Sequence, residues 1–315
     1  MKALLISVTV VCILLLASIY LFIPLKIAFS KVIIIKTKIN IANRFLFDEN
    51  KWGAWFPTDS VNAVASSGIN TYLYKGHFYS IKKKMLNAAE ASISNDQISL
   101  KSFFTMISIN EDSIAIEWKS NMPETSNPFN RLRDYIEARR LQKNMTDILI
   151  HLKTFLGKNE NIYGINLHVI ISKDSTLIAT KSVTTHYPST SNIYNLIGSL
   201  QKYIAGQGAK ENNFPMLNVK NVNDTAFETM VAIPVNKYLK GNDTIFNKRF
   251  VPWKVLTAEV KGGNYTVNNA LHQMAIYLTD YHIPAMAIPF ASLVTDRSKQ
   301  PDTLQWITRI YTPVP

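Results

Sequence analysis

The sequence contains a single cysteine, Cys12, among its 315 residues, so no disulfide can form within one chain. Cysteine usage therefore does not indicate the redox compartment. Histidines are also few, and their spacing matches neither HExxH nor another clustered pattern of metal ligands. The six are His77, His151, His168, His186, His272 and His282. We therefore predict no metal site and no cofactor.

Recognisable catalytic motifs are missing as well. The carboxylate pair Glu111-Asp112 lies in a polar segment with the composition of a turn, where it cannot serve as an acid and base in a cleft. Gly206-Gln-Gly208 matches half of a phosphate-binding loop, but it follows a predicted helix, whereas such a loop should precede one. The sequence therefore indicates no catalytic residue.

Acidic residues are the scarcer charge, 22 against 34 lysines and arginines, which gives a formal net charge of +12. A basic excess can attract nucleic acid. Here it is spread over both halves, and no helix-turn-helix, zinc-finger or aromatic-basic motif accompanies it. We predict no nucleic-acid partner. With 47% hydrophobic and 18% charged residues, the composition is that of a globular protein, and the length allows about two domains.

The longest stretch without charge runs from Ala3 to Leu25. As a helix it would extend about 35 Å, enough to cross a bilayer core of about 30 Å. The sequence therefore predicts a membrane anchor at 3–25, a single-pass membrane location, and the membrane as a partner. Only Lys2 precedes the stretch, so the positive-inside rule favours a cytoplasmic body. The basic residues that follow it are Lys26, Lys31, Lys36 and Lys38.

Residues 30–158 have the pattern of an antiparallel sheet followed by one long helix. An apolar, β-branched run from Lys31 to Ile39 predicts the first strand. Further strands are predicted at 71–79, 97–109 and 113–119. The helix is predicted to begin at Asn127-Pro128, since proline is tolerated in a first turn, and to end near Gly157.

This order of elements resembles the SRPBCC group, also called the START or polyketide-cyclase-like fold. The closest motifs are Lys51-Trp-Gly-Ala-Trp55 and Leu149-Ile-His-Leu-Lys-Thr-Phe155. The resemblance implies a helix-grip fold, in which a curved antiparallel sheet grips the long helix and leaves a cavity for an apolar molecule. Trp52 and Trp55 then either line the mouth of that cavity or pack as core aromatics.

Residues 163–315 contain an internal repeat. The segment Phe227–Val235 and the segment Trp306–Val314 each read as a strand that ends in Pro-Val. Predicted helices precede both copies, at 191–204 and 266–278, with apolar residues spaced by three and four. Their predicted N-caps are Ser191 and Thr266. We therefore predict an α+β domain made of a duplicated strand-helix-strand-strand unit, with a cleft between its halves.

Alternation along the repeated strands predicts which side chains face a ligand. Glu228 and Met230 share one face of the first copy, and Arg309 and Tyr311 share one face of the second. The opposite faces are mostly apolar and suit a covering helix. These four residues are the candidate ligand contacts. Glu228 and Arg309 either reach a ligand, with Arg309 binding a carboxylate or phosphate, or pair with each other.

Gly263-Asn-Tyr265, Val294-Thr-Asp296 and the final strand resemble the GyrI-like effector-binding domain. That family is the small-molecule-binding half of AraC-type and multidrug-responsive transcription regulators. By the resemblance, Arg309 stands where members often carry a ligand-contacting glutamate. Ala291 and Leu293 stand where an acid and a tyrosine are common. These departures argue against cationic ligands and against the hydrolase activity of some relatives.

Together these patterns predict a membrane-tethered, non-enzymatic protein that binds small hydrophobic or amphipathic molecules. The alternative is a hydrolase or cyclase that acts on a small hydrophobic substrate. A structural protein whose cavities are filled by side chains is the third possibility. The sequence does not indicate a protein partner.

Overall fold

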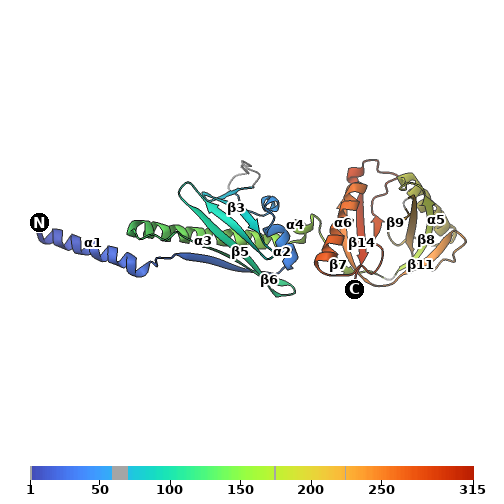
Figure 1. Ribbon diagram of the computed structural model, residues 1–315. Helices are drawn as coiled ribbons and strands as arrows, with labels where there is room; N and C mark the ends of the chain where they lie inside the picture. The colour runs from blue at the N-terminus through green and yellow to red at the C-terminus, as the bar shows by residue number, and fades with distance from the viewer. Residues whose placement is uncertain (1, 59–69, 174, 224) are drawn as a thin grey trace. The chain divides into compact units, whose positions relative to one another are not determined.

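The computed structural model describes residues 2–58, 70–173, 175–223 and 225–315. The chain divides into two compact units, 1–158 and 159–315. The first contains a six-stranded sheet and the second an eight-stranded sheet, and the strand pairings within the described residues are antiparallel. Helices accompany both sheets (Figure 1). The predicted α+β class is therefore confirmed.

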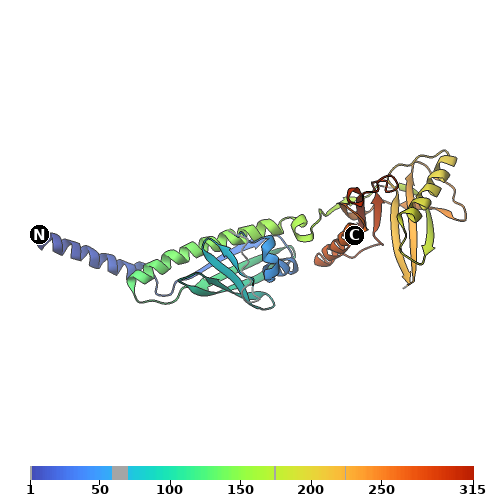
Figure 2. The same ribbon diagram turned by 90° about the horizontal axis from the view of Figure 1, so that it is seen from above.

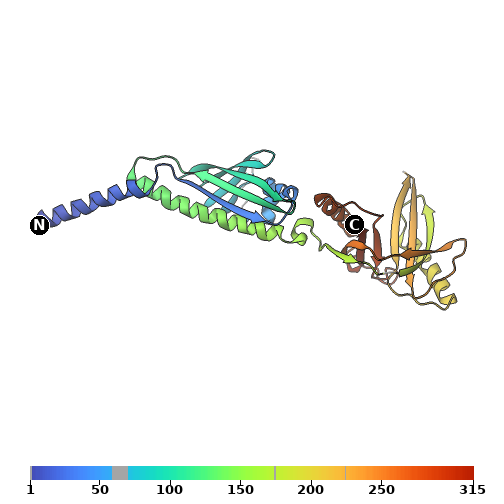
Figure 3. The same ribbon diagram turned by 90° about the horizontal axis from the view of Figure 1, so that it is seen from below.

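The sheet of the first unit has the strand order β1-β6-β5-β4-β3-β2. The long helix α3 (Pro128–Leu156) lies along it (Figure 3). The strands are β1 (Ala28–Ile35), β2 (Tyr72–Tyr74), β3 (His77–Lys84), β4 (Ala88–Ser94), β5 (Ser99–Asn110) and β6 (Ser113–Asn121). Two short helices, α2 (Ile39–Leu46) and the 3-10 helix η1 (Glu49–Ala54), follow β1, and α1 is described below. The short helix α4 (Asn159–Tyr163) begins the second unit.

Helix α3 begins and ends where the sequence predicts. The Oδ1 atom of Asn127 accepts hydrogen bonds from the backbone N–H groups of Phe129 and Asn130, and Gly157 is the C-cap. The helix buries a continuous apolar stripe because its inward positions recur every three or four residues. The fully buried members of this stripe are Leu141, Met145, Ile148, Leu149 and Leu152.

An aromatic cluster occupies the core of the first unit. Trp52 is 0% exposed, and its indole N–H donates to the carbonyl of Leu46 at 2.8 Å. Trp55 is 5% exposed and donates to the carbonyl of Phe45 at 3.0 Å. The Trp52 ring stacks on Phe56 with centroids 5.1 Å apart. The structure thus places Trp52 and Trp55 among packed core aromatics, the second of the two interpretations offered by the sequence.

Two features of this sheet were not predicted. The strand expected at 71–79 is two strands, because Lys75 and Gly76 take φ values of 46° and 76° and form the turn between β2 and β3. Strand β4 is rich in alanine and serine, which are weak signals of strand formation. Its burial nevertheless alternates, with Ala89, Ala91 and Ile93 facing inward.

The N-terminal segment forms helix α1 (Lys2–Phe22), which stops ahead of Pro24. Proline has no N–H group to continue a helical ladder, so the charge-free stretch 3–25 is not one uninterrupted helix. In the described part of the chain, no helix combines the length and the apolar character needed to span a membrane. The predicted anchor at 3–25 and the single-pass membrane location are therefore wrong, and the structure gives no support to the membrane as a partner.

The end of α1 instead packs on the start of α3 (Figure 2). The Tyr20 hydroxyl donates to the carbonyl of Ser126 at 2.8 Å. The guanidinium of Arg131, a residue that is 7% exposed, lies 5.3 Å from the centroid of the Tyr20 ring. These contacts join α1 to the first unit.

The second unit repeats the order strand, helix, strand, strand, as predicted. The first copy is β8 (Ser175–Thr184), α5 (Thr190–Gly206), β9 (Met216–Asn223) and β10 (Ala226–Val235). The second is β12 (Lys254–Lys261), α6 (Asn264–Asp280), β13 (Phe290–Leu293) and β14 (Ile307–Pro313). The helices begin slightly earlier than expected, with N-caps at Ser189 and Gly263 in place of Ser191 and Thr266.

The two halves exchange edge strands. The sheet order is β11-β8-β10-β9-β13-β14-β12-β7. Strand β7 (His168–Ile171) precedes the first copy in sequence but pairs with β12 of the second. Strand β11 (Ile245–Phe250) follows the first copy and pairs back with β8. At the centre, β9 and β13 join through two residue pairs, Leu217 with Ala291 and Met216 with Ser292.

One face of this sheet is covered by helices. Val231 and Ile233 of β10 are fully buried and belong to a core with Ile197 and Leu200 of α5. The intervening residues Met230 and Ala232 point to the other face, because successive side chains of a strand alternate. The predicted division of this strand into a helix-covered face and a second face is therefore confirmed.

The fit of α3 to its sheet predicts a position-specific loss of stability. Leu149→Ala should lower the free energy of unfolding by about 2–5 kcal/mol, because the buried side chain leaves a cavity. Its neighbour Ile150 is 48% exposed, so Ile150→Ala should change stability by less than about 0.5 kcal/mol. Urea unfolding of both variants measures the difference, and equal losses would contradict this packing.

Candidate functional site

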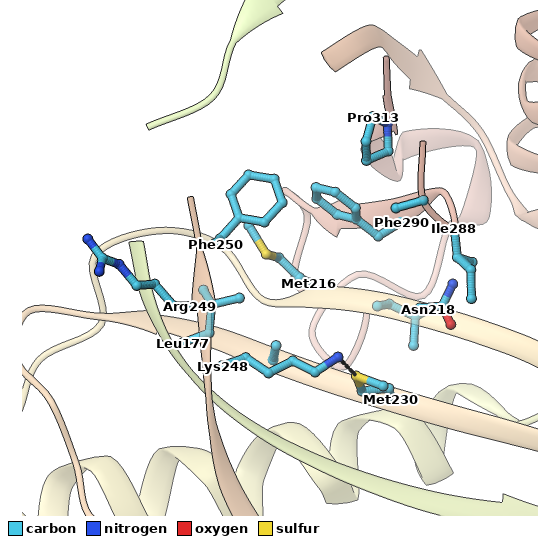
Figure 4. A pocket seen from close by; sticks show the side chains of 13 residues that line it. Leu177, Met216, Asn218, Met230, Lys248, Arg249, Phe250, Ile288, Phe290 and Pro313 are labelled. Atoms are coloured by element: carbon cyan, nitrogen blue, oxygen red, sulfur yellow. Dashed lines mark hydrogen bonds between the residues drawn. The ribbon is translucent and has the colours of Figure 1, made fainter. Parts of the chain in front are cut away.

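A cavity of about 520 Å³ opens on the second unit's sheet, on the face away from the helices (Figure 4). Met230 and Ala232, which alternate with the helix-facing residues of β10, both line it. Other contributions come from β8, β9, β11, β13, β14 and the segment before β13. The remaining lining residues are Leu177, Met216, Leu217, Asn218, Lys248, Arg249, Phe250, Ala287, Ile288, Phe290 and Pro313.

Strand register explains why these residues meet. Ala232 pairs with Met216 on one side and with Ala179 on the other, so all three share the open face. Lys248 pairs with Leu177 in the adjoining row. The small side chain of Ala232 leaves depth in the middle of the sheet, while the longer Met216 and Met230 rise beside it. Methionine is flexible and polarizable, so this floor can adapt to different apolar shapes.

Three aromatic rings form one wall. Phe290 of β13 stacks on Tyr311 of β14, with centroids 5.0 Å apart and planes at 17°. The edge-to-face partner of Phe290 is Phe250 of β11, at 5.4 Å and 81°. Strands β11 and β13 are separated by three others in the sheet order. Their side chains therefore meet only because the sheet curls around the cavity.

The charged residues that line the cavity are both basic, Lys248 and Arg249. Figure 4 shows them on neighbouring positions of β11, with the Lys248 chain lying across the floor toward Met230. The Lys248 ammonium is 3.3 Å from the Met230 sulfur, which is only a weak acceptor. An acidic group entering here would be a much stronger partner. The cavity thus combines apolar walls with a basic edge.

The four residues predicted to contact a ligand have different surroundings in the structure. Met230 lines the cavity, and Tyr311 lies behind Phe290 and supports it. Glu228 and Arg309 point to the same face, but each has its own ion-pair partner. Glu228 pairs with Lys181 at 3.1 Å, and Arg309 pairs with Glu259 at 2.7 Å. The predicted Glu228–Arg309 pair is replaced by these two pairs, and ligand contact by either residue stays a prediction.

Hydrogen bonding to Glu259 raises the pKa of Arg309, so this guanidinium is charged at any physiological pH. Arg309 pairs with Ser292, and Ser292 pairs with Met216, so Arg309 and Met216 lie in the same row across the sheet. Trp52 and Trp55 lie in the other unit and are buried there.

Sequence reasoning missed Phe250 and Lys248, because the segment 245–250 was not recognised as a strand. Its alternation of Phe246, Lys248 and Phe250 was a usable signal. The missing information was its partner, since only the pairing with β8 places it beside the cavity. Among the residues that the structure describes, no three or more His, Cys, Asp or Glu side chains gather as metal ligands would.

No protein-family model and no curated protein matches the chain. Similar solved structures include the C-terminal domain of EcmrR, at 15% identity and a TM-score of 0.42, over 48% of this chain and 98% of that one. SAV2435 bound to tetraphenylphosphonium matches at 15% identity and 0.31, over 48% and 94%. The Zhui aromatase/cyclase from Streptomyces sp. R1128 matches at 6% and 0.33, over 42% and 94%. Likenesses this distant assign no function to the chain.

The aromatic wall predicts a measurable coupling between Phe290 and Tyr311. Stacked rings contribute about 0.5–1.5 kcal/mol beyond the area they bury. A double-mutant cycle with Phe290→Leu and Tyr311→Leu should therefore give a coupling free energy in that range when unfolding is followed in urea. Strict additivity of the two single substitutions would show that the rings do not stack.

Proposed function

We propose that the unit 159–315 binds a small amphipathic anion, with its apolar body against Met216, Met230 and Phe290 and its acidic head at Lys248. The observation that carries the proposal is the composition of one cavity. It holds about 520 Å³, its walls are apolar, and its charged lining residues are both cations. Ligand sites commonly measure about 300–1,000 Å³ and combine apolar walls with a few placed polar groups.

An apolar tail alone would bind weakly. Burying a CH₂ group gains about 0.8 kcal/mol, so a nine-carbon tail gains about 7 kcal/mol at most. Association costs at least about 4 kcal/mol in lost translation and rotation. A hydrogen bond to a charged group adds about 1.5–3 kcal/mol. The acidic head therefore decides whether binding is measurable at sub-millimolar concentration, and the same cationic edge disfavours a positively charged ligand.

The four predicted ligand contacts have different roles in binding. Met230 touches the ligand, and Tyr311 holds Phe290 in place from behind. Arg309 and Glu228 carry their ion pairs on the same open face, where they shape the field around the mouth of the cavity. The proposed activity is binding, without a chemical step.

Isothermal titration of the full chain with two ligands of equal tail length tests the proposal. Decanoate should bind with a dissociation constant below about 1 mM, and decyltrimethylammonium should bind at least tenfold more weakly, because the cavity edge is cationic. Lys248→Glu should weaken decanoate binding about tenfold or more, since a hydrogen bond to a charged group contributes at least about 1.5 kcal/mol.

The matched control is Lys202→Glu, which makes the same charge change on an exposed position of α5, outside the cavity lining. It should leave decanoate binding unchanged. Equal affinities for the two ligands would refute the anionic preference, and no binding of either ligand would refute the cavity as a binding site. Consumption of a decanoate ester by the chain, abolished by Lys248→Glu, would favour the enzymatic alternative.

A further inference from the structure

A second, smaller cavity of about 140 Å³ lies on the helix side of the same sheet. It is located where β9 and β13 meet through only two residue pairs. Residues of β9, β13 and β14 form its floor, and the first turns of α6 form a wall. The lining residues are Tyr187, Leu217, Asn218, Val219, Asn264, Val267, Asn268, Leu271, Pro289, Phe290, Ala291, Arg297 and Ile310.

Arg297 is the charged residue of this lining, and it is only 8% exposed. Its Nη2 atom donates to the Thr308 hydroxyl at 2.8 Å, and its guanidinium lies 4.6 Å from the centroid of the Trp306 ring. The buried Nε–H donates to no group in the described residues. A hydroxyl and a ring hold this side chain in place without neutralising its charge.

The nearest carboxylate along the chain does not compensate Arg297. Asp296 accepts hydrogen bonds from Ser298 and pairs with Lys299 at 3.3 Å. Burial lowers the pKa of Arg297, which reflects the cost of holding the charge away from water. A buried cation without a carboxylate partner is costly unless an anion completes it. The guanidinium therefore suits an oxyanion that the described residues do not supply.

The rest of the lining suits a small carboxylate. Asn264 and Asn268 bring carboxamides from the first turns of α6, where the partial positive charge of the helix N-terminus also favours an anion. Tyr187 brings a hydroxyl. The other lining residues are mainly apolar, including Val267, Leu271 and Ile310. The volume is close to the roughly 150 Å³ of an engineered apolar cavity that holds benzene.

We propose that this cavity is a second ligand site, which takes a small aromatic or short-chain carboxylate with its oxygens on Arg297 and its apolar part against α6 and the sheet. The site is distinct from the larger cavity, because it lies on the opposite face of the sheet and has its own cation. Its ligand is correspondingly smaller, about the size of benzoate.

Titration of the full chain with benzoate tests this site, with benzamide as the uncharged probe of the same shape. Benzoate should bind, and benzamide should bind at least tenfold more weakly. Arg297→Gln should weaken benzoate binding at least tenfold. Lys248→Glu, in the larger cavity, should leave benzoate binding unchanged, so the outcome here is separable from the outcome for decanoate.

A second pair of variants leaves Arg297 intact, which keeps the test valid if Arg297→Gln does not fold. Asn268→Asp places a negative charge in the cavity lining and should weaken benzoate binding about tenfold. Asn269→Asp makes the same change one residue along the same helix, outside the lining, and should have no effect. Equal benzoate affinity in all variants, or binding of inorganic phosphate without benzoate, would overturn the proposal.

Discussion

The exchange of edge strands between the two halves is the constraint on which the second unit depends. Strand β7 enters the half that follows it, and β11 returns to the half that precedes it. Each half therefore completes its sheet with a strand from outside its own strand-helix-strand-strand copy. Neither copy is closed alone, and the central contact of only two residue pairs between β9 and β13 is reinforced at both edges. The sheet also curls, which brings Phe250 of β11 into contact with Phe290 of β13.

Periodicity made much of this architecture predictable. The Asn127 cap of α3 and its Gly157 end are local signals, and both are found in the structure. The repeat of β10 and β14 and the two faces of β10 follow from the two-residue period of a strand. The N-terminal stretch shows the limit of this reasoning, because absence of charge over 3–25 did not account for the stop before Pro24.

The cavities were less predictable, because they depend on pairings between distant segments. Alternation alone predicted the sheet face of Met230 and Tyr311, but Phe250 reaches the cavity only through the pairing of β11 with β8. Arg309 was placed on the correct face, yet its partner Glu259 on β12 was not visible from the repeat. Arg297 carried no pattern at all in the sequence. Its burial beneath Trp306 is a purely tertiary property.

Leu217, Asn218 and Phe290 line both cavities and so form a partition between them. The Asn218 carboxamide donates to the Pro289 carbonyl at 2.8 Å across the narrow junction of the halves, which ties the partition together. A shift of this shared wall changes the volume available on both of its sides. A ligand that moves this wall in one cavity therefore changes the binding free energy of a ligand in the other. Thermodynamic reciprocity requires the change to be the same in both directions.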